Sequence, residues 1–200
     1  MIWTLPNGLT MMRIIAAPVI AILVLVGGSD VAVLAFFLFI IASATDFLDG
    51  WLARRLDQES AVGKMLDPIA DKAMVTMVLF ALAAQPGAGS FAFAVPAAII
   101  IVREIMVSGL REFLGEIKLD VTRLAKFKTA AQLVALGTLL LAATITEDDI
   151  INPVETDADI SGQFIQALGL GLLWISAALT VISGFDYFRK GMAHIRLGKD

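Results

Sequence analysis

Long apolar runs separated by short polar breaks follow one another along the whole chain. A helix needs roughly 20 apolar residues to cross a bilayer, and tilt relaxes that length. The breaks contain helix-ending residues, such as Gly27-Gly28-Ser29 and Gln85-Pro86-Gly87, and Ser60 is placed to cap a helix. The pattern predicts an all-α integral membrane bundle of six transmembrane helices. They are expected at about residues 8 to 27, 31 to 54, 61 to 84, 91 to 114, 124 to 146 and 162 to 188.

The composition agrees with a membrane protein, because 58% of the residues are hydrophobic and only 17% are charged. The absence of cysteine excludes a disulfide framework, a thiolate metal site and a cysteine nucleophile. The first apolar run, residues 14 to 28, has no small-residue cleavage site followed by a polar segment, so we expect a retained helix and no signal peptide. The short breaks predict a single membrane domain over residues 1 to 200.

Lysine and arginine fall on one side of the predicted bundle. With six spans both termini lie on that side, together with all basic residues except Arg13, Lys72 and Arg103, which fall within spans. The opposite loops contain no basic residue, and the last of them, residues 147 to 159, is acidic. Because basic loops stay in the cytoplasm, we expect both termini there. The acidic loop is most simply a solvated surface.

Four aspartates lie at the ends of the second and third predicted helices that face the cytoplasm. Asp46 and Asp49 share one helix face, and Asp67 and Asp71 share another. If the two helices form an antiparallel hairpin, the pairs meet at similar depth. Four carboxylates in a space poor in water need a counter-charge. Oxygen ligands without Cys or His favour Mg²⁺ or Mn²⁺, and such ions assist the displacement of phosphoryl groups.

Small residues accompany the aspartates. Gly50, Ala53 and Gly63 leave room for a ligand to approach the carboxylates, although small residues in membrane helices also serve close helix packing. Pro68, directly after Asp67, marks the first turn of a helix or kinks it.

The spacing of these residues resembles a known signature. The pattern Asp46-x2-Asp49-Gly50-x2-Ala53-Arg54-x8-Gly63-x3-Asp67-x3-Asp71 matches that of the CDP-alcohol phosphatidyltransferases. The resemblance implies a homodimeric membrane enzyme with six transmembrane helices that displaces CMP from a CDP-linked lipid or alcohol with the help of a divalent metal. "TLPNGLTMMRI" (4 to 14), "REIMVSGLRE" (103 to 112) and "AKFKTAAQ" (125 to 132) are similar to bacterial members that use glycerol 3-phosphate as the acceptor.

The resemblance implies a reaction between CDP-diacylglycerol and sn-glycerol 3-phosphate that gives phosphatidylglycerophosphate and CMP, at the cytoplasmic face of the bacterial inner membrane. Asp71 is then the general base, and no nucleic-acid partner is expected. The metal ligands would be Asp46, Asp49, Asp67 and Asp71, and the residues near CDP-diacylglycerol would be Asn7, Thr10, Gly50, Ala53, Arg54 and Gly63. For Asn7 and Thr10 a helix-capping role is an open alternative.

The acceptor phosphate needs basic groups. Arg103 lies well inside a span, where arginine is costly unless it faces a cavity or a partner. We expect it to form an anion site together with Ser108, Arg111, Lys126 and Lys128. Two alternatives remain: Arg103 forms a structural ion pair with Glu104 or another acid, and the lysines only follow the positive-inside rule or touch lipid head groups.

Other functions also fit part of the pattern. Another member of the same family would use inositol phosphate, serine, phosphatidylglycerol or a choline-type head group as acceptor. A divalent-cation transporter would need ionisable groups near the midplane on several helices and exits to both faces. A non-catalytic scaffold would tolerate the loss of Asp71.

Overall fold

The computed structural model describes residues 4–55, 60–85, 91–114, 123–146 and 157–197, and every element in these ranges is a helix. The helices are α1 (Leu5–Val26), α2 (Ser29–Arg55), α3 (Ala61–Ala83), α4 (Phe91–Leu114), α5 (Arg123–Thr146) and α6 (Asp157–Leu197). The predictions of an all-α fold and of six helices are confirmed, and the bounds of the first five agree to within a few residues.

Side-chain caps fix the starts of two helices. Thr4 precedes α1, and its hydroxyl accepts a hydrogen bond from the backbone N–H of Asn7. Ser60 precedes α3 and accepts from the backbone N–H of Gly63 over 2.9 Å. Such caps satisfy N–H groups that have no partner within the helix. The predicted capping role of Ser60 is confirmed.

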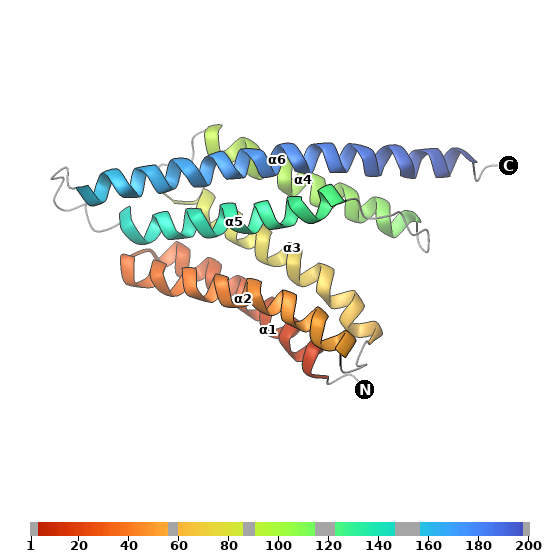
Figure 1. Ribbon diagram of the computed structural model, residues 1–200, viewed down its shortest axis with the longest axis horizontal. Coiled ribbons are helices and arrows are strands. Elements are labelled where there is room, and N and C mark those ends of the chain that lie inside the picture. Colours follow the sequence, from red (N-terminus) through yellow and green to blue (C-terminus); the bar gives the residue numbers. More distant parts are fainter. Residues whose placement is uncertain (1–3, 56–59, 86–90, 115–122, 147–156, 198–200) are drawn as a thin grey trace.

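The last helix, α6, is longer than predicted at both ends. Its 41 residues span about 60 Å, twice the hydrocarbon thickness of about 30 Å. Figure 1 shows it running past the other helices toward the C-terminus. In this part an ion pair between Lys190 and Asp186 joins successive turns of the helix. The apolar run ends near residue 188, but backbone hydrogen bonds and such pairs continue the helix into polar surroundings.

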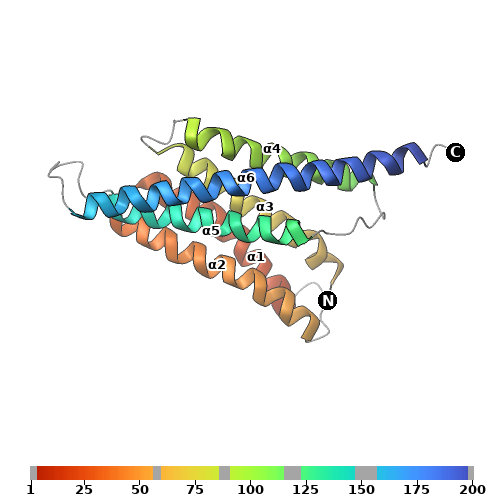
Figure 2. The same cartoon turned by 45° about the horizontal axis from the view of Figure 1, so that its top comes forward.

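The helices pack as a bundle of two groups (Figures 1 and 2). α1 packs against both α2 and α3, while α5 packs along α6, α4 on α6, and α2 on α5. Within the described residues α2 and α3 have few contacts with each other. The two helices run antiparallel, as expected, but within the described residues they are joined mainly through α1, against which both of them pack.

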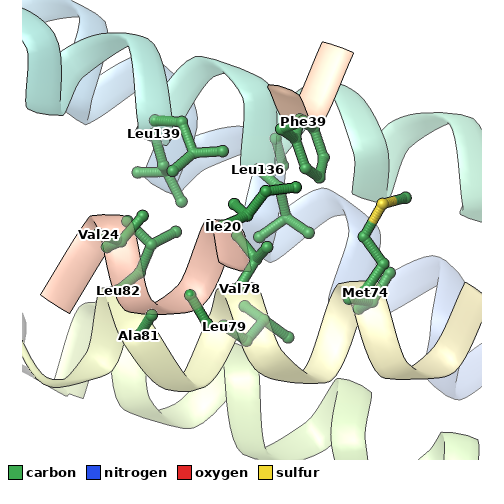
Figure 3. Packing of buried hydrophobic residues seen from close by; sticks show 14 of the residues in the cluster. Ile20, Val24, Phe39, Met74, Val78, Leu79, Ala81, Leu82, Leu136 and Leu139 are labelled. Carbon is green, nitrogen blue, oxygen red and sulfur yellow. The ribbon is translucent and has the colours of Figure 1, made fainter. Parts of the chain in front are cut away.

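A core of apolar side chains joins α1, α2, α3 and α5 (Figure 3). Ile20, Phe39, Val78 and Leu136 have almost no exposed surface. Gly169 of α6 lies so close to α5 that an added Cβ would stand 2.8 Å from a side-chain carbon of Leu139. Close approach through small residues provides van der Waals packing, which holds membrane helices together where lipid is as apolar as the protein.

Large apolar side chains also cover the outside of the bundle, which marks a surface in contact with lipid. Five described helices are long and apolar enough to cross a membrane, so the chain is a multi-pass membrane protein. α3 is not among these five, because its first half carries Lys64, Asp67, Asp71 and Lys72. Exposed apolar residues occur on all six helices, for example Ile15, Phe37, Phe80, Ile105, Val134 and Phe185.

Candidate functional site

The predicted site residues gather at one end of the bundle. α2 and α4 end there, α1, α3 and α5 begin there, and α6 passes through it on its way to the C-terminus (Figure 1). The sequence places Asp46 in the second half of α2 and Asp67 and Asp71 in the first half of α3. Helix spacing and chain reversal therefore bring acidic residues from two helices to the same depth.

A buried arginine on α1 joins the two acidic helices. Nη1 of Arg13 donates hydrogen bonds to Oδ1 of Asp46 and to Oδ1 of Asp71, the latter over 2.6 Å. The Arg13 side chain is fully buried, whereas those of Asp46 and Asp71 are 35% and 46% exposed. Hydrogen bonds between ionised partners are among the strongest in proteins. One cation thus fixes two carboxylates that belong to different helices.

The third described aspartate has a different partner on α1. The hydroxyl of Thr10 lies 2.9 Å from Oδ1 of Asp67 and 3.2 Å from the backbone oxygen of Pro6, and it is 1% exposed. Pro68, which follows Asp67, lies inside α3 and removes one helical N–H donor beside the site. Thr10 is therefore positioned to orient the carboxylate of Asp67.

Asn7 lies at the contact between the starts of α1 and α3. Its side-chain oxygen accepts a hydrogen bond from the hydroxyl of Ser60 over 2.9 Å. An added Cβ at Gly63 would stand 2.6 Å from this oxygen, so the glycine permits the close approach of α1. The alternative that Asn7 or Thr10 caps α1 is wrong, because the cap is Thr4. The packing role expected of small residues applies to Gly63.

Several predicted residues have side chains outside the described part of the structure. On α2 these are Asp49, Gly50, Ala53 and Arg54, and on α4 and α5 they are Arg111 and Lys126. Their predicted roles stay predictions.

The donor set at the carboxylates suits a hard divalent cation. The described carboxylate and hydroxyl atoms that could bind a metal are all oxygens. The three negative charges of Asp46, Asp67 and Asp71 outnumber the single positive charge of Arg13, so the cluster still attracts a cation. Among the described side chains, no group of three or more His, Cys, Asp or Glu residues closes on one point. Arg13 donates to both Asp46 and Asp71, and Asp67 is hydrogen-bonded to Thr10. The residues fit a metal site whose ligands are arranged by contacts with α1.

A second charged cluster joins α4, α5 and α6. Glu104 forms ion pairs with Arg103 over 3.2 Å and with Lys128, and Nη2 of Arg103 donates to the hydroxyl of Ser183 over 3.2 Å. Lys128 is 5% exposed, and among the described residues Glu104 is the acid that pairs with both cations. The structural ion pair of Arg103 with Glu104 that the sequence left open is present. The excess positive charge still favours an anion.

Ser108 is used within its own helix. Its hydroxyl donates to the backbone oxygen of Glu104 over 2.5 Å, one turn earlier in α4. This bond leaves the oxygen of Ser108 as an acceptor, which does not favour an anionic ligand. Its predicted contact with the acceptor phosphate stays a prediction.

Sequence reasoning missed Arg13, Ser183 and Gly184. Arg13 was noted only as a basic residue within a span, although the cost of burying an arginine is a signal that an acidic partner lies near it. Ser183 and Gly184 carry no such signal, because small and weakly polar residues are common in membrane helices.

Comparison with known proteins identifies the family. A model of the CDP-alcohol phosphatidyltransferase family matches residues 3–182. The chain is 41% identical to a protein of Cereibacter sphaeroides named CDP-diacylglycerol–glycerol-3-phosphate 3-phosphatidyltransferase, over 97% of this chain and 98% of that protein. Proteins of the same name from Rickettsia typhi (41% identity; 92% and 95% covered) and Pseudomonas fluorescens (37%; 96% and 92%) are also similar. The resemblance drawn from the aspartate spacing is confirmed, and the chain belongs to the CDP-alcohol phosphatidyltransferase family.

Proposed function

We propose that this chain transfers the phosphatidyl group of CDP-diacylglycerol to sn-glycerol 3-phosphate, giving phosphatidylglycerophosphate and CMP, as an enzyme of phospholipid biosynthesis. One observation carries the proposal. A cluster with excess negative charge, formed by Arg13 with the aspartates, and a cluster with excess positive charge, formed around Arg103 and Lys128, lie toward the same end of the bundle. The names of the similar proteins support this choice of donor and acceptor.

The carboxylates are proposed to hold Mg²⁺ or Mn²⁺ through Asp46, Asp49, Asp67 and Asp71. A bound divalent metal neutralises charge on the phosphoryl oxygens and on the leaving group. Thr10 keeps Asp67 oriented through its 2.9 Å hydrogen bond, and Arg13 holds Asp46 and Asp71 close together by donating from one nitrogen to both. These contacts arrange the carboxylates before substrate binds, which lowers the reorganisation that the reaction requires.

Asp71 is proposed to be the general base. The hydroxyl oxygen of glycerol 3-phosphate forms a bond to the phosphorus that carries diacylglycerol, and the bond from this phosphorus to the CMP oxygen breaks. The hydroxyl proton passes to the carboxylate of Asp71. Such proton transfer contributes about 10²- to 10⁴-fold, so positioning and electrostatics must supply most of the acceleration.

The donor nucleotide is proposed to bind beside the carboxylates. Asn7 and Thr10 of α1 present polar groups at this end of the bundle, and both are buried. Gly63 keeps the starts of α1 and α3 close enough for these groups to line one site. The complete set proposed to contact CDP-diacylglycerol is Asn7, Thr10, Gly50, Ala53, Arg54 and Gly63.

The acceptor phosphate is proposed to bind at the basic cluster. Arg103 and Lys128 each form an ion pair with Glu104, and the excess positive charge of this cluster suits a phosphate dianion. Arg111 and Lys126 lie on the same two helices, nearer their ends, and Ser108 lies between Arg103 and Arg111. These residues together form the proposed acceptor site.

The protein is proposed to be a single membrane domain over residues 1 to 200, in the bacterial inner membrane, with its termini and site facing the cytoplasm. α1 begins and α6 ends at the same end of the bundle, which agrees with termini on one side (Figure 1). The distribution of lysine and arginine supports the cytoplasmic side. A homodimer is proposed from the family resemblance.

The test is a comparison of acceptors. Purified protein in detergent micelles is given CDP-dioleoylglycerol and Mg²⁺ with glycerol 3-phosphate, inositol phosphate, serine or phosphatidylglycerol, and CMP release is measured. Only glycerol 3-phosphate is expected to support release, and Lys128→Met is expected to raise the KM for it. CMP release with inositol phosphate or serine but not with glycerol 3-phosphate would contradict the substrate. Flux of divalent ions into proteoliposomes without CMP release would indicate a transporter.

A further inference from the structure

We propose that Ser183 and Gly184 of α6 are positioning residues for the acceptor site, because together they fix the side chain of Arg103. This inference rests on the proposed function, and it gives a role to a helix for which the family resemblance provided none. Arg103 comes from α4, so its guanidinium depends on neighbouring helices for its orientation.

The hydroxyl of Ser183 is oriented by its own helix. It donates its proton to the backbone oxygen of Thr180 over 3.1 Å, and its oxygen accepts from Nη2 of Arg103 over 3.2 Å. Ser183 is 6% exposed, so water does not compete for this oxygen. Because the proton is already committed, the hydroxyl presents a lone pair to the guanidinium.

Gly184 provides the space in which the Arg103 side chain lies. A Cβ added at this position would stand 2.9 Å from Cγ and 3.2 Å from Nε of Arg103. Any larger residue would therefore push the arginine away from Ser183. The glycine and the arginine both line a groove of about 500 Å³ between α4 and α6, whose other lining residues are apolar. In such surroundings each polar contact of the guanidinium counts for more than it would in water.

Glu104 holds the opposite edge of the guanidinium through Nη1. Each terminal nitrogen of Arg103 thus has one partner: the charged Glu104 at Nη1 and the neutral Ser183 at Nη2. Its Nε atom is buried and has no hydrogen-bond partner within the described residues. The arrangement pre-orients a cation that has donor capacity left for an anionic ligand, and pre-orientation reduces the cost of binding.

The test compares glycine and serine variants of α6 in the purified full chain. Gly184→Ala is expected to raise the KM for glycerol 3-phosphate about tenfold, since a misplacement of about 1 Å can cost about 100-fold. Ser183→Ala, which only removes an atom, is expected to raise it about threefold. The KM for CDP-diacylglycerol should stay within about twofold of the wild-type value, because Arg103 belongs to the basic cluster and the donor nucleotide is proposed to bind beside the aspartates.

Two other glycines of the same helix provide controls. An added Cβ at Gly171 meets nothing within 4 Å, so Gly171→Ala should leave both KM values unchanged. An added Cβ at Gly169 meets Leu139, so Gly169→Ala should lower the melting temperature without a selective rise in the KM for glycerol 3-phosphate. A selective rise in Gly169→Ala as large as that in Gly184→Ala would overturn the positioning role.

A double-mutant cycle separates action through Arg103 from a general effect on packing. In the background of Arg103→Ala, which lacks the Cγ and Nε atoms that the new methyl group would meet, Gly184→Ala should change the KM less than about twofold. Where turnover is too slow, calorimetric binding of glycerol 3-phosphate replaces the KM. Equal effects of Gly184→Ala in both backgrounds, or no effect in the wild type, would refute the inference.

Failure of the proposed function has a different outcome. In that case the wild-type protein releases no CMP with glycerol 3-phosphate, and the same variants are measured with the acceptor that supports release. A selective rise in its KM that depends on Arg103 would support the positioning role, and the absence of such a rise would overturn it.

Discussion

Arg13 of α1 donates to Asp71 of α3 over 2.6 Å while it also contacts Asp46 of α2, so one buried guanidinium stands between the two acidic helices. α2 and α3 have few contacts with each other within the described residues, and this arginine is a polar connection between them. It supplies the positive charge that lets the carboxylates lie close together before a metal binds.

Replacement of Arg13 by methionine should destabilise the metal-free protein. The two carboxylates would lose their shared cation, and breaking a buried pair costs about 3 to 5 kcal/mol. Because Asp46 and Asp71 are partly exposed, we expect a loss of about 2 kcal/mol in the free energy of unfolding. The measurement is thermal unfolding in detergent with EDTA, followed by addition of Mg²⁺, which should recover most of the loss.

The matched control is Arg189→Met, which removes an exposed arginine from α6. It should unfold at the same temperature as the wild type under both conditions. If Arg13→Met unfolds like this control in EDTA, the arginine does not hold the acidic helices together.

Asp71→Asn should abolish turnover while metal binding is largely retained. An amide cannot take the proton of the acceptor hydroxyl, so we expect CMP release to fall about 10²- to 10⁴-fold. The other carboxylates still attract the metal, which can be measured by electron paramagnetic resonance with Mn²⁺. Asp30→Asn, at the opposite end of α2 from Asp46, is the control and should keep normal activity. Normal turnover of Asp71→Asn would exclude this residue as the general base.

The number of helices and the limits of the first five could be predicted from the sequence, because a bilayer requires long apolar runs and the breaks contain Gly, Pro and charged residues. The packing of α1 against both α2 and α3 could not be predicted. Consecutive helices are usually neighbours in space, and this rule favoured a direct hairpin of α2 and α3. Packing of α1 against both depends on the combined shapes of many side chains, such as Gly63 beside Asn7.

At the candidate site, the sequence suggested the partner of one arginine within a span but not the partners of the other. Arg13 and Arg103 both lie in apolar runs, where their cost predicts a partner, but the sequence does not say which acid that is. Glu104, the neighbour of Arg103 in sequence, was a visible candidate. Asp46 and Asp71 are distant from Arg13 in sequence, and only the fold brings them together.

Thr10→Val should weaken metal binding through Asp67. The substitution keeps the shape of the side chain but removes the hydroxyl that lies 2.9 Å from the carboxylate. Loss of a partner that orients a metal ligand typically costs about 10- to 100-fold in metal affinity or activity. Titration with Mn²⁺ measures the affinity. Thr138→Val, which removes an exposed hydroxyl bonded only to its own helix, should bind Mn²⁺ like the wild type. Equal affinities of the two variants would leave Thr10 without a role in the metal site.

Gly63→Ala should impair use of the lipid donor more than use of the acceptor. The new methyl group would stand 2.6 Å from the side-chain oxygen of Asn7 and would displace it from the hydroxyl of Ser60. Because Asn7 is proposed to contact the nucleotide, the KM for CDP-diacylglycerol should rise about tenfold, whereas that for glycerol 3-phosphate should change little. Initial rates with each substrate varied in turn provide both constants. Gly8→Ala on α1, where an added Cβ meets nothing within 4 Å, should leave both constants unchanged. A rise confined to the constant for glycerol 3-phosphate would place Asn7 at the acceptor and not at the nucleotide.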